Sequence, residues 1–259
     1  MAGGRGTPGE RATLGISVSK IPLILLPGTL CSVALFVHQV QNLADVSSPK
    51  VIAVHLHDNL HAVAQYILRQ VEGEFAVAGL SYGGIVAFEL WRQAAPRITK
   101  MALLNTNPHE ASAQIRERQR RFVEMTHHGQ FREITTDFLK DAMLHPDHRK
   151  NLALRETVLM MAESIGIDGF MNQIKAQLAR PSAMQDLPNI TCPTLVLTGR
   201  EDQVVPLPVH IKMAEMLPNS RLVIVEQCGH LSTLEQPEVV TQALRDWLTG
   251  DGIWKERVT

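Results

Sequence analysis

Short apolar runs alternate with amphipathic stretches through most of the 259-residue chain. Their length and nearly continuous hydrophobicity are typical of β-strands that are buried on both faces of a sheet. The runs fall at residues 21–28, 51–56, 75–80, 100–106, 194–199 and 221–226. We therefore predict a strand at each of these positions.

Helical periodicity fills the intervals between the runs. In residues 59–71, for example, Leu60, Val63, Ala64 and Ile67 share one face of a helix. Further helices are predicted near residues 33–44, 83–95, 207–217 and 237–249. The alternation predicts an α/β fold: a mostly parallel sheet of about six or more strands with helices on both faces.

One interval, residues 110–187, breaks the alternation because it contains no strand pattern. About four amphipathic helices are predicted in it, near residues 111–127, 131–144, 149–165 and 167–180. The interval follows the fourth strand, whose carboxyl end lies on the edge where open parallel sheets bind ligands. We predict a four-helix cap over that edge, inserted in a core of residues 19–109 and 188–259. The alternative is a purely structural helical layer.

Composition disfavours several classes of function. The net charge of −1 and isoelectric point of about 6.8 do not favour nucleic acid or acidic membrane surfaces as partners. No apolar run approaches the roughly 20 residues of a membrane span, and residues 1–18 are predicted to be a flexible tail. Cys31, Cys192 and Cys228 are too few and too scattered for a disulfide framework or a zinc site. We predict a cytoplasmic location.

A serine motif lies at the junction of the third strand and the next helix. Residues 79–83, Gly-Leu-Ser-Tyr-Gly, match the pattern G-x-S-x-G. At such a junction a sharp turn lifts the serine hydroxyl out of the sheet, and the flanking glycines leave room for that turn. Ser81 is therefore a candidate nucleophile. The alternative is a glycine-rich turn with an idle serine.

A serine hydroxyl needs a base, and a histidine oriented by a carboxylate is a common one. Asp202 follows the fifth predicted strand, and His230 follows the sixth. The carboxyl ends of parallel strands meet at one edge, so both residues are predicted to lie near Ser81. The order serine, acid, histidine is also the chain order of this catalytic triad in α/β folds.

From about residue 20 to 250 the chain resembles the α/β-hydrolase family. The resemblance rests on the segments LLPGTLCS, GLSYGG, GREDQVVP and CGHLSTLEQPE. It is strongest to small capped bacterial carboxylesterases, such as the pimeloyl-carrier methyl ester esterases, and to 3-oxoadipate enol-lactonases. It implies a serine hydrolase for a small-molecule ester or lactone, with no metal or cofactor. It also assigns the acid role to Asp202 rather than to Glu201, which we interpret as solvated. Some relatives carry the acid after the fourth strand, where this chain has Asn105 and no carboxylate.

The resemblance further implies an oxyanion hole made of two backbone N–H groups. One belongs to Tyr82, directly after the nucleophile, and the other to Thr29, in the loop after the first strand. The chain departs from its relatives at both places. The loop begins Pro27-Gly28 instead of His-Gly, and Tyr82 replaces the usual Met, Leu or Gln. The tyrosine ring is a candidate for narrowing the pocket.

Other residues with chemical potential have plainer interpretations. His55, His57 and His61 lie near Asp58 and resemble metal ligands, but a polar strand end is the preferred interpretation because only one carboxylate is present. Three methionines and a phenylalanine of the insertion either line an acyl pocket or belong to the core. They are Met160, Met161, Met171 and Phe170. A basic stretch either steers an acidic substrate or carrier protein, or forms a solvated helix face. It contains Arg116, Arg118, Arg120 and Arg121.

The sequence leaves other functions open because a fold does not fix a substrate. The same triad can serve acyl transfer, perhydrolysis or C–C bond hydrolysis. A hydrolase-fold binding or signalling protein could use the triad as a ligand pocket. A structural homo-oligomer with vestigial chemistry is a third alternative. The sequence does not specify acyl and alcohol groups, pathway or oligomeric state.

Overall fold

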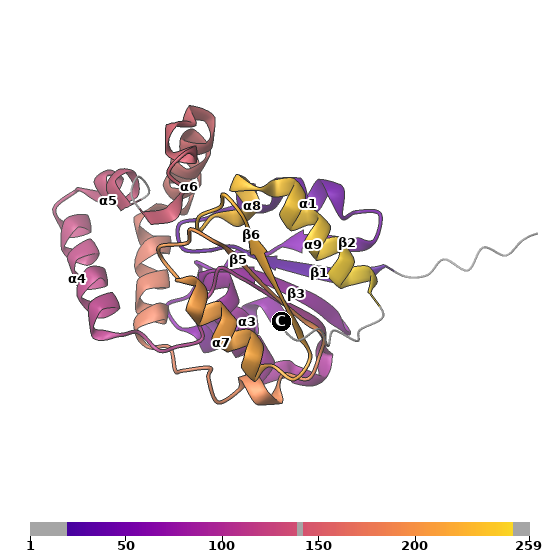
Figure 1. Cartoon of the computed structure of the whole chain (residues 1–259). Helices are drawn as coiled ribbons and strands as arrows, with labels where there is room; N and C mark the ends of the chain where they lie inside the picture. Colours follow the sequence, from indigo (N-terminus) through magenta and orange to yellow (C-terminus); the bar gives the residue numbers. More distant parts are fainter. Residues whose placement is uncertain (1–19, 139–141, 251–259) are drawn as a thin grey trace, which may run out of the picture.

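The computed structural model describes residues 20–138 and 142–250; the tail predicted for residues 1–18 lies outside them. Six parallel strands form one sheet in the order β2-β1-β3-β4-β5-β6 (Figure 1). The strands are β1 Ile21–Leu26, β2 Ser47–Val51, β3 Phe75–Leu80, β4 Ile98–Leu104, β5 Thr194–Gly199 and β6 Ser220–Val225. The predicted fold class is confirmed.

Helices cover both faces of the sheet because both faces are apolar. Along β1, Leu23 and Leu25 belong to one buried cluster, whereas Ile24 and Leu26 belong to the other. This alternation is the two-residue period of a strand buried on both sides. One face carries α1 (Val37–Asn42) and α9 (Pro237–Thr249). The other carries α2 (Leu60–Leu68), α3 (Tyr82–Ala94) and α7 (Leu207–Met216).

The prediction of the second strand was wrong. Residues 51–56 were expected to form it, but β2 is Ser47–Val51, whose sequence is mostly polar. This strand lies at the sheet edge, where Pro49 is tolerated and a continuous apolar run is not required. Ile52 and Val54 are still buried, in the cluster beneath α2 and α3. The apolar run therefore indicated burial correctly but not strand pairing.

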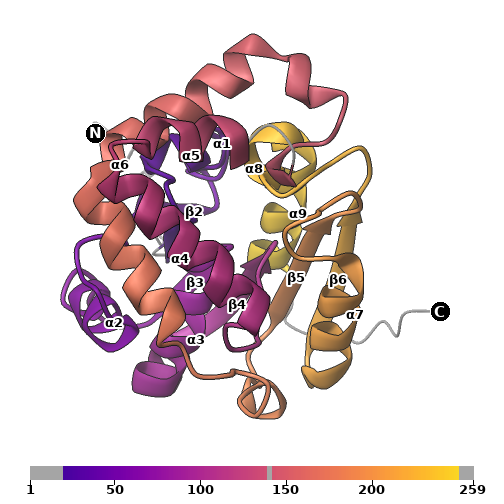
Figure 2. The same ribbon diagram turned by 90° about the vertical axis from the view of Figure 1, so that its left-hand side faces the viewer.

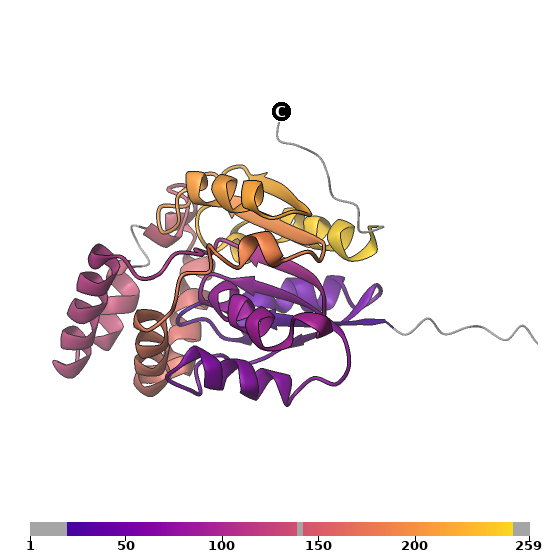
Figure 3. The ribbon, with the colours of Figure 1, turned by 90° about the horizontal axis from the view of Figure 1, so that it is seen from below.

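Helices α4 (Ala113–His127), α5 (Phe131–Phe138) and α6 (Leu152–Leu178) lie between β4 and β5 in the chain. Figures 2 and 3 show that they lie together beyond one end of the strands. That end is formed by the carboxyl ends of the strands. In the sheet, β1 pairs with β2 on one side and with β3 on the other, so the strand order reverses at β1. Such a reversal of strand order opens a crevice for ligands. We refer to α4, α5 and α6 as the insertion.

The insertion keeps one predicted break between helices and differs from the prediction at the end of another helix. The third and fourth predicted helices fall within α6, which is kinked where Gly166 takes a non-helical conformation (φ 67°, ψ −179°), as the predicted break at residues 166–169 requires. The helix predicted over residues 131–144 is described as α5 only to Phe138, and residues 139–141 lie outside the description. The short elements are η1 Val33–Phe36, η2 Ala95–Arg97, η4 His148–Lys150, η5 Leu187–Asn189 and α8 Ser232–Glu235. Within the described ranges, no helix has the length and hydrophobicity of a membrane span.

A buried histidine on α7 makes stability depend on pH. Burial lowers the pKa of His210 from 6.5 to about 4, although the nearby Asp202 carboxylate opposes this shift. The unfolded chain binds this proton below pH 6.5, so the stability from a neutral His210 is lost as pH falls from 6.5 towards 4. We expect this group to lower the free energy of unfolding by about 3 kcal/mol across that window.

Urea denaturation of His210→Leu at several pH values measures this effect. The variant should lose less stability on acidification than the wild type. His109→Gln, at an exposed histidine, is the matched control and should keep the wild-type pH dependence. Equal slopes for wild type and His210→Leu would contradict the prediction.

Candidate active site

Ser81 occupies a strained turn between β3 and α3. Its backbone angles are φ 54° and ψ −113°, and such a conformation costs a non-glycine residue on the order of 1–3 kcal/mol. Two hydrogen bonds, one to the last residue of β4 and one to the loop after it, stabilise it. The Ser81 N–H donates to the carbonyl of Leu104 at 2.9 Å, and the Ser81 carbonyl accepts from Thr106 Oγ1 at 2.7 Å.

The backbone is packed too closely around the two glycines of the serine motif to admit a side chain at either position. A Cβ atom added to Gly79 would lie 2.3 Å from the backbone of Gly83. A Cβ atom added to Gly83 would lie 1.9 Å from the carbonyl oxygen of Leu26. No side chain fits at either position without moving the backbone of β1 or α3. The structure thus supplies the physical reason for the G-x-S-x-G pattern.

Asp202 and His230 form a buried hydrogen-bonded pair at the same sheet edge. His230 Nδ1 lies 2.8 Å from Asp202 Oδ2, and the two residues are 0% and 4% exposed. Glu201, the competing acid, instead accepts a hydrogen bond from the N–H of Cys228 at 3.0 Å. The carboxylate that contacts the histidine is therefore that of Asp202.

The surroundings of Asp202 keep it ionised. Burial alone would raise the pKa of Asp202, but the adjacent His230 and hydrogen bonds from Asn105 and Val205 outweigh burial and hold it below its usual value. Backbone N–H groups of Val204 and Val205 donate to Oδ1 at 2.8 and 2.9 Å. An ionised Asp202 accepts from Nδ1–H of His230, and in the neutral imidazole this tautomer makes Nε2 the nitrogen that can act as a base.

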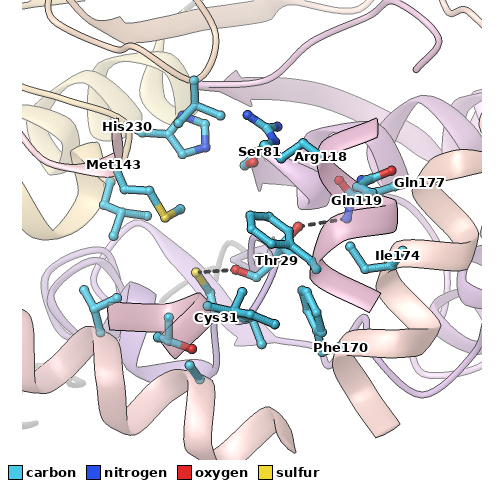
Figure 4. A pocket seen from close by; sticks show the side chains of 18 residues that line it. Thr29, Cys31, Ser81, Arg118, Gln119, Met143, Phe170, Ile174, Gln177 and His230 are labelled. Atoms are coloured by element: carbon cyan, nitrogen blue, oxygen red, sulfur yellow. Dashed lines mark hydrogen bonds between the residues drawn. The ribbon is translucent and has the colours of Figure 1, made fainter. Parts of the chain in front are cut away.

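Ser81 and His230 line one cavity between the sheet edge and the insertion (Figure 4). His230 Nε2 is buried and has no hydrogen-bond partner within residues 20–138 and 142–250. A hydrogen bond between Ser81 Oγ and this nitrogen is thus not formed in the present conformation. Bonds of this kind are often long in the free enzyme and tighten when substrate binds.

The rest of the cavity wall is mostly apolar. The space inside it is about 720 Å³, including part that is open to solvent. The apolar residues that the insertion and the chain between its helices contribute to the wall include Ile134, Met143, Val158, Ala162, Phe170 and Ile174. Such a wall can bury apolar atoms of a ligand.

The predicted methionines do not line this cavity. Met161 is buried in the core cluster beside α1 and α9, and Met160 is 56% exposed. Met171 is also absent from the wall, whereas Phe170 belongs to it. Helical spacing shows that residues share a face, but it does not show which face meets the cavity.

Both predicted oxyanion donors lie beside Ser81 in the chain or the fold. Tyr82 is the first residue of α3, so its N–H has no partner inside the helix. Thr29 lines the cavity, and a Cβ atom on the preceding Gly28 would lie 3.4 Å from the Cβ of Ser81. The expectation that the Tyr82 ring narrows the pocket was wrong, because Tyr82 is absent from the cavity wall. It is fully buried in the cluster beneath α2 and α3, and burial raises its pKa.

Arg118 brings positive charge into the cavity wall. Burial and the charges of Arg116 and Arg118 lower the pKa of Arg180, which is 5% exposed, to about 10. The described acceptors of Arg116 and Arg180 are backbone carbonyl oxygens. Arg120, by contrast, pairs with Glu117 on the surface. The basic stretch is therefore divided between the cavity and the solvated face of α4.

Cys31 and Cys228 have the properties of buried, unreactive core residues. Cys31 lines the cavity, but burial raises the pKa of its thiol to about 12. Burial also raises the pKa of Cys228, and nearby carboxylates add to that effect. Both thiols therefore stay protonated near neutral pH and are poor nucleophiles.

His55 and Asp58, which follow β2, contact the insertion. The carbonyl of His55 accepts from Asn172 Nδ2 at 3.1 Å, and Asp58 lies 3.7 Å from Lys175 Nζ. Among the described residues, no group of three or more His, Cys, Asp or Glu side chains could hold a metal ion. Of the four polar residues, His55 and Asp58 contact α6, whereas His61 contacts Gln65 and Gln93.

Sequence reasoning did not identify Asn105 as a partner of the acid. Asn105 is fully buried and donates from Nδ2 to Asp202 Oδ2 at 2.9 Å and to the carbonyl of Gly229 at 3.2 Å. Its own Oδ1 accepts from Ser232 Oγ at 2.6 Å. Its position at the end of β4 was the available signal, but only the absence of a carboxylate there was noted.

A second missed residue, Glu235, holds the loop that carries His230. Its buried carboxylate accepts from the N–H groups of Gly229 and Leu231 at 3.1 and 3.2 Å, on either side of the histidine. It also accepts from the N–H of His145 in the chain between α5 and α6, at 2.7 Å. One carboxylate thus joins the histidine loop to this segment.

The carbonyl of Met143 makes a second connection between the same segments. It accepts from the N–H of His230 at 2.9 Å and from that of Leu231 at 3.3 Å. The chain that leads into α6 is therefore hydrogen-bonded directly to the backbone of the candidate base.

Fold and site together define an α/β hydrolase. The sequence profile of the alpha/beta hydrolase family matches residues 26–243, and the chain belongs to this family. The chain is 29% identical over 89 residues to a 2-hydroxy-6-oxononadienedioate/2-hydroxy-6-oxononatrienedioate hydrolase of a Pseudomonas species, covering 34% of this chain and 31% of that one. Matches to two further hydrolases of this name cover about 30% of their length.

Longer matches agree with the resemblance seen in the sequence. A pimeloyl-[acyl-carrier protein] methyl ester esterase of Aromatoleum aromaticum is 23% identical, over 74% of this chain and 80% of its own. An esterase structure from Thermogutta terrifontis with malate bound has a TM-score of 0.80 at 27% identity, covering 89% and 90% of the two chains. The enol-lactonase of Burkholderia xenovorans has a TM-score of 0.79 at 17% identity, covering 89% and 92%, and shows the shared fold.

Proposed function

We propose that this protein is a serine hydrolase that cleaves a small carboxylic ester or lactone through an acyl-enzyme on Ser81. The observation that carries the proposal is the buried His230–Asp202 pair, with a 2.8 Å contact, in the wall of the cavity that Ser81 also lines. This arrangement supplies a nucleophile, a base and an acid that orients the base.

In the first half of the reaction, Ser81 Oγ attacks the substrate carbonyl carbon while His230 Nε2 takes the hydroxyl proton. Asp202 stabilises the resulting imidazolium. The N–H groups of Thr29 and Tyr82 donate to the negative oxygen of the tetrahedral intermediate. The intermediate collapses, the C–O bond to the alcohol breaks, and His230 returns the proton to the leaving oxygen.

In the second half, water repeats the attack on the acyl-enzyme. His230 removes a proton from the water, and the tetrahedral intermediate expels Ser81 Oγ, which takes that proton back. The products are a carboxylic acid and an alcohol, joined in one molecule when the substrate is a lactone. Residues 110–187 form the cap in this proposal, and residues 19–109 and 188–259 form the catalytic core.

Arg118 favours substrates that carry a carboxylate. It is a positive side chain in the cavity wall, close to the further charges of Arg116 and Arg180. The name of the dioate hydrolase relative and the malate in the esterase structure both point to dicarboxylates. We expect Arg118→Met to raise KM for the monomethyl ester of a dicarboxylic acid by about tenfold. That factor corresponds to the loss of roughly 1.4 kcal/mol of attraction between the arginine and the carboxylate.

Neutral esters of the same length provide the comparison for Arg118→Met. Their KM should change by less than about threefold, because they have no charge to lose contact with. Arg121→Met, at an exposed arginine of the same helix, is the control variant. If KM rose equally for charged and neutral esters, the effect would be one of shape and not of charge.

A fluorophosphonate probe tests the proposed function directly. Phosphonylation needs a serine whose proton can pass to a base and donors that stabilise the developing oxyanion. We expect one adduct per chain, located at Ser81 by peptide mass analysis and absent from Ser81→Ala. A folded wild-type protein that gave no adduct, and no turnover on a panel of esters and lactones, would exclude the proposed function in favour of a binding protein.

A further inference from the structure

The loop that follows β1 is held by two glutamines of α6. Gln173 Oε1 accepts from the N–H of Leu30 at 3.0 Å, and Gln173 Nε2 donates to the carbonyl of Gly28 at 3.4 Å. Gln177 Nε2 donates to the side-chain hydroxyl of Thr29 at 3.0 Å. The loop and these glutamines are more than 140 residues apart in the chain, so the contact depends on how the insertion packs.

The two bonds of Gln173 fix both peptide planes that flank Thr29. A trans peptide is planar, and its C=O and N–H groups point in opposite directions. The carbonyl of Gly28 is held by Gln173 and by the N–H of Cys31 at 3.2 Å. The Thr29 N–H, in the same plane, is thereby directed away from Gln173. The next plane is fixed through the N–H of Leu30.

This loop would not keep its shape by backbone preference alone. Leu30 has φ 57°, in the left-handed region that leucine rarely adopts. Such a conformation persists where the surroundings impose it. Leu30 packs beside Ile134, Phe170 and Ile174 of the insertion, and its N–H ends on Gln173. The insertion thus stabilises the strained residue directly after Thr29.

We propose that Gln173 is a positioning residue for the oxyanion hole. It holds the Gly28–Thr29 peptide so that the Thr29 N–H points at the oxygen of the substrate carbonyl. The proposal rests on the proposed function of Ser81 and Thr29. Gln173 is fully buried and is absent from the cavity wall, so its effect passes through the loop and not through contact with substrate.

Replacement by an apolar side chain of similar length, Gln173→Met, removes both hydrogen bonds. We expect kcat to fall by about 10- to 100-fold. This fall is no larger than the one caused by complete removal of one oxyanion donor, because the Thr29 N–H is misdirected and not removed. KM should stay within about threefold, because the variant changes no wall residue. The rate of fluorophosphonate labelling should fall by the same factor as kcat, since that reaction uses the same donors.

Two other variants separate positioning from general packing. Asn172→Leu removes a bond from the neighbouring residue of α6 to the carbonyl of His55 and leaves the loop untouched. It should lower Tm and leave kcat within about threefold. Gln173→Glu keeps an acceptor for Leu30 but loses the donor to Gly28, so kcat should again fall by at least about tenfold. If Gln173→Met does not fold, the kcat of Gln173→Glu tests the positioning role in its place.

The outcomes distinguish this inference from the proposed function. A wild-type protein with no turnover and no Ser81 adduct overturns the proposed function and, with it, this role of Gln173. A wild-type protein that is active, with Gln173→Met and Gln173→Glu equally active, overturns the positioning role alone. A matched fall in kcat for Asn172→Leu would likewise show that α6 acts only through packing.

Discussion

Ser81→Ala is expected to lower kcat on any accepted ester by roughly 10⁴-fold or more, because the members of a catalytic triad act as a unit. The fold should persist, since alanine keeps the Cβ atom and the strained backbone is held by Leu104 and Thr106. Turnover of chromogenic esters measures the loss, and thermal denaturation checks the fold.

Ser48→Ala is a suitable control, because Ser48 is an exposed serine on the edge strand β2. It should keep wild-type turnover. If Ser81→Ala retained activity within tenfold of the wild type, the nucleophile would have to be sought elsewhere in the cavity.

Asp202→Asn is expected to lower kcat by about 10⁴-fold as well, while leaving the shape of the site intact. The amide can donate to Nδ1 of His230, which would place the imidazole proton on Nε2. His230 could then no longer accept the proton of Ser81. In the wild type, Asn105 Nδ2 donates to the carboxylate oxygen Oδ2 of Asp202 at 2.9 Å. An asparagine at position 202 would meet that donor with its single side-chain oxygen or with its own NH₂ group.

Steady-state kinetics of Asp202→Asn should be compared with those of Glu201→Gln. The second variant changes a carboxylate that binds the N–H of Cys228 and does not touch His230. We expect it to keep turnover within about tenfold of the wild type. An active Asp202→Asn together with an inactive Glu201→Gln would reverse the assignment of the acid.

Much of this architecture could be predicted because its signals are local. Buried parallel strands appear as apolar runs, and their carboxyl ends meet at one edge. Ser81, Asp202 and His230 each follow such a run, so three local patterns predicted a shared location. Where the local pattern and the pairing differ, as at β2, the prediction failed. Edge strands are defined by their neighbour and not by their own hydrophobicity.

The residues that surround the site could not be predicted in this way. Asn105 lies 97 residues from Asp202, and Gln173 lies 143 residues from Leu30. No spacing rule connects such pairs, because the packing of α6 on the core determines them. Gln173 and Glu235 occupy ordinary polar positions in their own segments. Their importance comes from the buried backbone groups that they satisfy.

The contacts of the insertion with the two loops bear on how such enzymes can diversify by recombination. On the histidine side, the acceptor is the backbone carbonyl of Met143, which any residue can supply. On the other side, a side chain with both an acceptor and a donor is needed, and Gln173 provides it. A chimera that receives a foreign insertion should therefore keep its histidine loop ordered, but reach full turnover only when a glutamine arrives in the same register. The insertion and the loop after β1 would thus have to be exchanged together, because Gln173 joins them through two hydrogen bonds.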